Sequence, residues 1–84
     1  MNHDFQIGDL VYIINDCYVF MKSRAKVISV GGLGVIIQTD PPKKYYNDEL
    51  MLRWHKDSVK VQVSESVSGW IQVDNLRLAF KKDE

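Results

Sequence analysis

The hydrophobic residues of this chain fall in short runs that alternate with polar positions, and glycines and prolines separate the runs. Val59, Val61 and Val63 alternate with polar residues, which is the period of a strand that buries one face. β-Branched residues suit the pleated surface of a sheet and lose rotamer freedom in a helix. The same pattern predicts strands around Val11 and Ile13 and over Ala25–Val30, Gly34–Thr39, Leu50–Trp54, Val59–Val63, Trp70–Val73 and Arg77–Phe80, with one helical turn at Asp74–Leu76. Such a set of short strands, with frequent turn signals, is typical of a small closed or nearly closed all-β barrel.

The connections between these strands are of two kinds. Gly31-Gly32-Leu33 is a short link that predicts a hairpin between Ala25–Val30 and Gly34–Thr39, because glycine adopts the positive φ of tight turns at little cost. Asn15–Arg24 and Asp40–Glu49 are long enough to be functional loops, and residues 40–58 form an enlarged loop or an added hairpin. Alternation within the strands predicts a core of inward-facing residues: Val11, Ile13, Val27, Val35, Val61 and Val63.

The composition is that of one small globular domain spanning residues 1–84. Uninterrupted apolar stretches reach only five residues, whereas a membrane span needs about 20, so we expect no membrane partner. The first residues lack the basic region and apolar core of a signal peptide. A single cysteine cannot form an internal disulfide and fits a reducing compartment, which predicts a cytoplasmic location.

Both ends of the chain resemble known small barrels. Phe5-Gln6-Ile7-Gly8-Asp9-Leu10-Val11-Tyr12-Ile13 reads F-x-x-G-D-x-V-x-I. This pattern is similar to the opening of SH3-like barrels in KOW-type modules, in the photosystem I small peripheral subunit and in the variable subunit of ferredoxin–thioredoxin reductase. Within it, Gly8 allows a tight turn and Asp9 is expected to satisfy turn amides.

The segment Gly69–Leu78 resembles the closing segment of bacterial SH3-like domains, in which a Gly-Trp strand leads through one helical turn into a last short strand. Together the two resemblances cover residues 5–39 and 59–80. They imply an all-β SH3-like barrel of five to seven short strands, with one helical turn near the C-terminus. They attach no catalytic residues to the chain.

Candidate catalytic and metal-binding residues are few. His3 and His55 are far apart and have no partner at metal-ligand spacing, so we expect no metal and no cofactor. Cys17 follows Asp16, whose negative charge raises a thiol pKa and disfavours the reactive thiolate. Gly31–Gly34 precedes strand-like residues and not a helix, which argues against a phosphate-binding loop. We therefore expect no enzymatic activity.

Positive charge and aromatic residues are concentrated in the middle of a chain whose net charge is zero. Residues 1–21 carry −3, residues 22–60 carry +4 and residues 61–84 carry −1. The residues that we expect to contact a partner lie in the two long loops and the strand that follows them: Tyr18, Phe20, Met21, Lys43, Lys44, Tyr45, Tyr46, Arg53 and Trp54. Such residues anchor protein interfaces. They also stack on bases and contact phosphates, and a third interpretation is that they are ordinary core and surface residues.

We predict a non-catalytic protein-interaction module or accessory subunit that docks on an unidentified larger protein and is a monomer or weak dimer in isolation. The run Tyr18–Met21 in an otherwise polar loop is typical of an interface anchor. The small size would also suit a phage- or plasmid-borne modulator of a host protein. The alternative is a KOW-like RNA- or DNA-binding module. Zero net charge weighs against it, because phosphate contacts dominate such affinities, and Asn15–Arg24 lacks the glycine expected in the first basic loop of that family.

Overall fold

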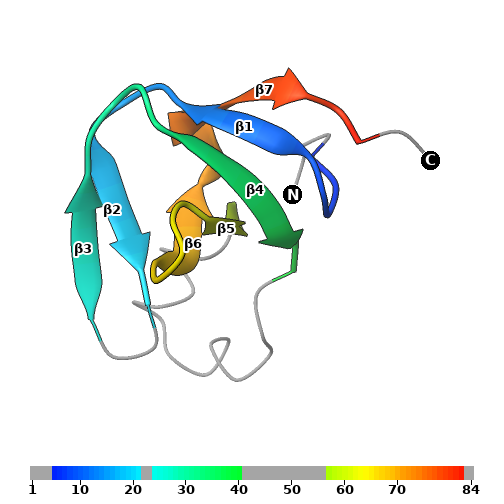
Figure 1. The fold of residues 1–84 in the computed structure, drawn as a ribbon. Helices are drawn as coiled ribbons and strands as arrows, with labels where there is room; N and C mark the ends of the chain where they lie inside the picture. Colours follow the sequence, from blue (N-terminus) through cyan, green and yellow to red (C-terminus); the bar gives the residue numbers. More distant parts are fainter. Residues whose placement is uncertain (1–4, 22–23, 41–56, 83–84) are drawn as a thin grey trace.

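The computed structural model describes residues 5–21, 24–40 and 57–82, and its regular structure there is β-strand apart from one 3-10 turn. The strands are β1 (Leu10–Ile13), β2 (Cys17–Phe20), β3 (Ala25–Ile28), β4 (Leu33–Gln38), β5 (Ser58–Gln62), β6 (Ser68–Gln72) and β7 (Leu76–Phe80), and the turn η2 (Val73–Asn75) joins β6 to β7 (Figure 1). The all-β class and the turn before the last strand are confirmed. The strand predicted at Leu50–Trp54 lies outside the described residues.

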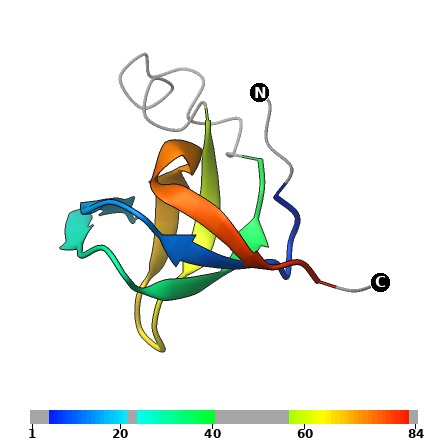
Figure 2. The same cartoon turned by 90° about the horizontal axis from the view of Figure 1, so that it is seen from above.

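The seven strands form one antiparallel sheet in the order β3-β2-β6-β5-β4-β1-β7. Figures 1 and 2 show that this sheet curls around the interior of the molecule. Its two terminal strands, β3 and β7, are not paired with each other in the described part of the chain. The all-β class and the predicted number of five to seven strands are confirmed, although β2 was not among the predicted strands, and the sheet is not closed into a barrel.

The predicted hairpin between Ala25–Val30 and Gly34–Thr39 is wrong. β3 pairs with β2 instead, and β4 lies between β1 and β5. The segment Asn15–Arg24, which we predicted to be a loop, thus contains β2. Gly31 has a φ of 100°, and its N–H donates to the Ile13 carbonyl oxygen over 2.8 Å, so the glycines direct the chain towards β1 and not back along β3.

The core is one cluster of side chains from six strands: Val11, Ile13, Val19, Ile36, Val59, Val61, Ile71 and Leu76. Of the residues that we predicted to face inward, Val11, Ile13 and Val61 are confirmed. Val63 is half-buried against the cluster.

Two predicted core residues are exposed. Val27 is 61% exposed and Val35 is 39% exposed. In β4 the buried positions are Gly34 and Ile36, so Val35 lies on the outer face. Gly34 packs directly against Val61 of β5 with no room for a Cβ. The close approach of these two strands therefore sets the face that β4 turns inward.

A buried carboxylate ties the start of β1 to the end of the chain. The Asp9 Oδ2 accepts hydrogen bonds from the Gln6 N–H at 2.8 Å and the Lys81 ammonium at 3.2 Å, and its Oδ1 accepts one from the Lys82 N–H at 3.0 Å. Gly8 has a φ of 98°. The turn roles predicted for Gly8 and Asp9 are confirmed, and Asp9 also holds the C-terminal segment.

Candidate functional site

Three of the predicted partner-binding residues lie in the described part of the chain. Tyr18 and Phe20 belong to β2, and Met21 follows it. The other six lie outside the described residues: Lys43, Lys44, Tyr45, Tyr46, Arg53 and Trp54. The predicted apolar anchor is not a loop, because β2 buries Val19 completely and leaves Tyr18 51% exposed on the opposite face. Val19 is thus a core residue and takes no part in a surface.

Tyr18 and Phe20 line a groove of about 180 Å³ between β2 and η2, together with Asp16, Cys17, Gln72 and Asn75. Since Tyr18 and Phe20 are two positions apart in one strand, they share a face, and their ring centroids are 6.1 Å apart with a 43° tilt. Phe20 pairs with Trp70 of β6, which is 4% exposed. The sheet therefore places one half-buried aromatic residue, Phe20, and one more exposed aromatic residue, Tyr18, in the groove.

Hydrogen bonds fix the segment that enters this groove. The Ile14 N–H donates to the Asn75 carbonyl oxygen at 2.9 Å, and the Asn15 side-chain amide donates to the Asn75 Oδ1 at 3.3 Å. On the other side, the Val30 N–H donates to the Asp16 Oδ1 at 2.8 Å. Asn and Asp commonly bond backbone close to them in sequence, but these bonds join residues 60 and 14 positions apart, so no local sequence signal indicates them. The groove is preformed by these contacts.

The thiol of Cys17, which lines the groove, is not activated. Burial, and after it the negative charge of Asp16, raise the pKa of the Cys17 thiol. The predicted direction is confirmed, and the thiol is protonated near neutral pH, which makes it a poor nucleophile. In the described residues, no three His, Cys, Asp or Glu side chains gather where they could hold a metal ion. Aromatic faces next to the amides of Gln72 and Asn75 are suited to a peptide side chain and its backbone.

A second cavity, of about 250 Å³, lies between β3, the start of β4 and the turn that joins β5 to β6. In Figure 1 this turn is seen between the β2–β3 hairpin and β4. The lining of the cavity is mostly apolar, and Lys26 is the charged residue among the described residues that form it. The lining residues are Ile13, Lys26, Ile28, Ser29, Gly32, Leu33, Val63, Ser64 and Val67. The sequence pattern did not indicate this cavity, because its residues come from separate segments that meet only when β3 and β4 do not pair.

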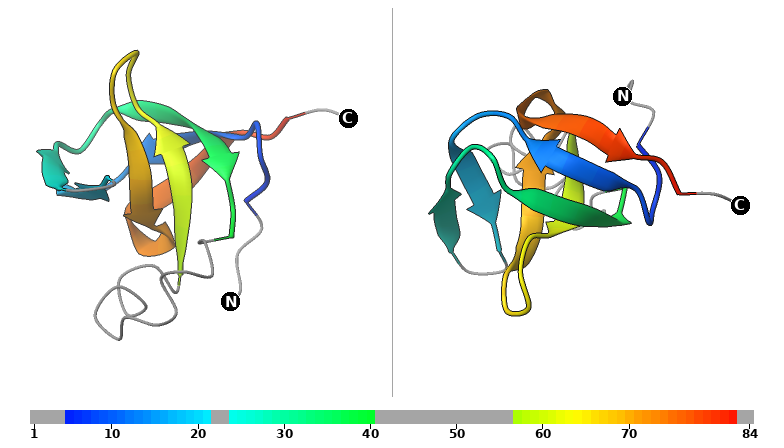
Figure 3. Two further views of the ribbon diagram at one scale, coloured as in Figure 1. Left: turned by 90° about the horizontal axis from the view of Figure 1, so that it is seen from below. Right: turned by 45° about the horizontal axis from the view of Figure 1, so that its top comes forward.

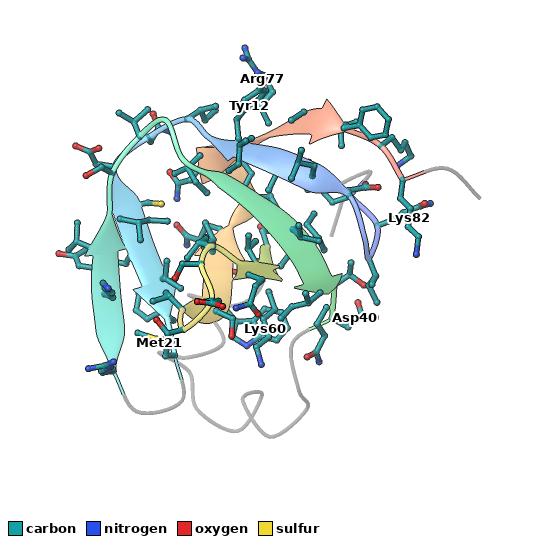
Figure 4. The ribbon with its side chains drawn as sticks, viewed as in Figure 1. Tyr12, Met21, Asp40, Lys60, Arg77 and Lys82 are labelled. Carbon is teal, nitrogen blue, oxygen red and sulfur yellow. The ribbon has the colours of Figure 1, made fainter. Side chains whose placement is uncertain are left out.

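The outer face of β1 and β7 carries a further exposed tyrosine. Tyr12 pairs across the sheet with Arg77, whose guanidinium carbon is 5.6 Å from the centre of the Tyr12 ring. Both side chains project away from β1 and β7 on the same side of the molecule (Figure 4). Tyr12 does not line either cavity, so it is a natural control for Tyr18.

Comparisons of the chain with protein-family models, with curated proteins and with solved structures found no match. Within residues 5–21, 24–40 and 57–82, no helix has the length and apolar character that crossing a bilayer requires. The proposals below are therefore based on the groove at Tyr18 and on the cavity at Lys26, which lie beside the β2–β3 hairpin.

Proposed function

We propose that this chain is a non-catalytic protein-interaction module that docks on a larger cytoplasmic protein as an accessory or modulating subunit. The observation that carries the proposal is the aromatic groove, where the exposed Tyr18 and the half-buried Phe20 lie beside Gln72 and Asn75. Aromatic side chains present a large contact area, and they carry much of the energy of protein interfaces. A partner side chain entering the groove would meet an aromatic surface on one side and hydrogen-bonding amides on the other.

We also propose that the curled sheet is an open form of the SH3-like barrel. Two features support this assignment. β6 leads through η2 into β7, as expected from the resemblance of Gly69–Leu78 to bacterial SH3-like domains, and β7 then pairs with β1. In the sequence, the β2–β3 hairpin lies between β1 and β4, but in the sheet it lies at the end next to β6, where it provides one wall of the groove.

The groove gives little support to the alternative, a KOW-like RNA- or DNA-binding module. Its lining includes the carboxylate of Asp16, which repels phosphate, and no Lys or Arg among the described residues. Phosphate contacts by cations supply most of the sequence-independent affinity for nucleic acids. Lys43 and Lys44 lie outside the described residues, and their contribution is tested by mutation below.

Replacing two exposed tyrosines in turn tests the proposal. We would immobilise the wild-type chain and the variants Tyr18→Ala and Tyr12→Ala separately. Each would then be used to capture proteins from a native lysate, with and without nuclease treatment. We expect the wild type and Tyr12→Ala to retain the same protein. Tyr18→Ala should bind that protein, once purified, more weakly by roughly 1–3 kcal/mol. Because Tyr18 and Tyr12 are about half exposed, at 51% and 41%, each variant should lose no more than about 1 kcal/mol in the free energy of unfolding. Phe20 is half-buried and makes a less clean probe.

The double variant Lys43→Ala with Lys44→Ala distinguishes the nucleic-acid alternative. If the partner is a protein, the double variant associates with it at a modestly different rate and binds it with almost the wild-type affinity. If the partner is a nucleic acid, the double variant binds every nucleic-acid sequence more weakly than the wild type. The slope of log affinity against log salt concentration then becomes shallower by about two. Loss of the captured material on nuclease treatment, or equal capture by all three tyrosine forms, would contradict the docking proposal.

A further inference from the structure

β3 is a terminal strand of the sheet, and the described residues leave one of its edges unpaired. It pairs with β2 through consecutive residues without a bulge, and no other strand of the described residues pairs with it. The Met21 N–H donates to the Arg24 carbonyl oxygen at 2.8 Å, so these two residues form a hydrogen-bonded pair of the β2–β3 ladder. Because hydrogen-bonding residues alternate along an antiparallel pair, the backbone groups of Ala25 and Val27 point away from β2. Within residues 5–21, 24–40 and 57–82, these groups are available to a further strand.

The cavity of about 250 Å³ lies beside this open edge. Lys26 and Ile28 of β3 line it on one side and Leu33 of β4 on the other. The two views of Figure 3 show the turn between β5 and β6 next to the space between the hairpin and β4. A strand added to β3 would direct every second side chain to the face of Lys26 and Ile28, since side chains alternate across a sheet. Those side chains would enter the cavity.

The charge of the cavity indicates what kind of side chain it accepts. Lys26 is the only charged residue among the described residues that line it, and Ser29 and Ser64 add hydroxyl groups. No described carboxylate lies within ion-pair distance of Lys26. An unpaired ammonium beside apolar walls favours a ligand that combines an apolar group with a carboxylate. In an extended segment, an apolar and an acidic residue two positions apart meet this requirement.

The other terminal strand is less suited to strand addition. The pairing of β7 with β1 shifts register between Leu10 and Val11, which places a bulge in β7. Bulges twist an edge and protect it from pairing. In addition, Lys81, which follows β7, is held in the ion pair with Asp9. The regular edge of β3, with a cavity next to it, is the better acceptor.

We propose that β3 binds an extended segment of a partner protein as an additional strand. The segment carries an apolar residue that fills the cavity and, two positions away, an acidic residue that pairs with Lys26. Main-chain hydrogen bonds then provide affinity, and the pocket for alternate side chains provides selectivity. The site is independent of the Tyr18 groove, because Lys26 is paired with Val19 on the opposite face of the hairpin from Tyr18.

A synthetic peptide, acetyl-Thr-Thr-Ile-Thr-Glu-Thr-Thr-amide, tests the charge pairing, since its isoleucine and glutamate share one face when extended. Titration into the full chain would be followed by NMR chemical shifts. We expect saturable binding to the wild type and binding at least about tenfold weaker to Lys26→Glu. Replacing the peptide glutamate by lysine should restore binding to Lys26→Glu, because a charge exchange is compensated only between groups in contact. Lys26→Gln should give an intermediate affinity.

Val27→Pro tests the open edge. The Val27 amide points away from β2, so proline removes an edge donor without removing a bond of the β2–β3 ladder. Val27→Thr keeps the N–H and the β-branch, and is the matched control. We expect Val27→Pro to weaken peptide binding at least about tenfold and Val27→Thr at most about twofold. If Val27→Pro disturbs the hairpin, amide exchange in the wild type replaces it: the peptide should slow exchange at Ala25 and Val27 at least about tenfold.

Tyr18→Ala separates this site from the groove and is expected to change peptide binding by no more than about twofold. Four results would each overturn the proposal. They are no saturable binding at millimolar peptide, no effect of the charge exchange, no protection of the two edge amides, and loss of binding in Tyr18→Ala. The last result would place the peptide in the groove and leave the proposed function intact.

Discussion

Asp9 illustrates how one side chain connects distant parts of this small domain. Its carboxylate is buried and accepts hydrogen bonds from the backbone of Gln6 and Lys82 and from the side chain of Lys81. Burial raises the pKa of Asp9, but the hydrogen bonds from Lys82, Gln6 and Lys81 outweigh it, and the pKa is lowered below its ordinary value. The folded chain therefore favours the charged form, and ionisation of Asp9 stabilises the fold.

We expect Asp9 to contribute to acid sensitivity. Since its folded-state pKa lies below the unfolded value of about 3.9, the contribution is complete above about pH 5 and is lost as the pH falls through the folded pKa. Asp9→Ala should lower the free energy of unfolding at pH 7 by about 1–3 kcal/mol, because two backbone N–H groups lose their acceptor. It should also flatten the loss of stability below pH 5. Urea unfolding between pH 7 and pH 2 measures both effects.

Glu65→Gln is the matched control for Asp9, because Glu65 is an exposed acidic residue in the turn between β5 and β6. It should keep the wild-type dependence on pH. An unchanged acid profile in Asp9→Ala would show that other carboxylates determine the acid sensitivity.

At the scale of strands, the pattern predicted where most elements lie but not which of them pair. β5 and η2 lie within one residue of their predicted positions, because Val59–Val63 alternates clearly and Asp74 and Asn75 favour a turn. Val27 and Val35 were assigned to the wrong face. Val35 lies between Gly34 and Ile36, so no polar neighbour marks its outer side. Val27 follows Lys26, whose charge predicts that Lys26 faces outward and Val27 inward, but both side chains are exposed. Contact between strands decides the face, as Gly34 against Val61 shows.

β2 and the groove show the same limit. The run Cys17–Phe20 contains no charged or amide side chain that would reveal alternation, so the pattern does not predict a strand there. Its aromatic residues were nevertheless identified as binding candidates from residue type alone. Gln72 and Asn75 were not, because they reach the groove only through the pairing of β2 with β6 at Phe20 and Trp70. A contact between residues so far apart in sequence leaves no local signal.

The pairing of β2 with β6 depends on Gly69, which makes Gly69→Ala a direct test of this element. A Cβ at this position would lie 2.6 Å from the Phe20 carbonyl oxygen and from a methyl group of Val19. Since the Phe20 oxygen belongs to the backbone, the two strands must separate. We expect a loss of about 1–3 kcal/mol in the free energy of unfolding, measured with urea.

Gly32→Ala is the control for Gly69→Ala, because the nearest atom to its Cβ is 3.7 Å away in Ile13. Its free energy of unfolding should stay within about 0.5 kcal/mol of the wild type. Equal stability of the two variants would mean that β2 and β6 can separate at no cost, and the groove would then not be preformed.

At the scale of the whole molecule, both proposed sites depend on one hairpin. Tyr18 faces the groove on one side of it, and Lys26 faces the cavity on the other. The curled sheet leaves this hairpin at one end and β7 at the other (Figure 2). A change that detaches the hairpin from β6 should therefore weaken both sites, whereas Tyr18→Ala and Lys26→Glu should each affect only one.

The open edges also determine how the chain associates with itself, and we expect a monomer or weak dimer at micromolar concentration. β7 is bulged and is followed by Lys81 and Lys82, and β3 carries Lys26. Pairing two copies of β3 about Val27 would bring both Lys26 side chains to one face of the new ladder, where like charges repel. Sedimentation velocity should therefore give a mass near 9.7 kDa. Lys26→Thr removes the repulsion and should increase self-association, and high salt should act in the same direction by screening it. A tight higher oligomer of the wild type at micromolar concentration would contradict this account, and would indicate that the outer face around Tyr12 associates instead of the strand edges.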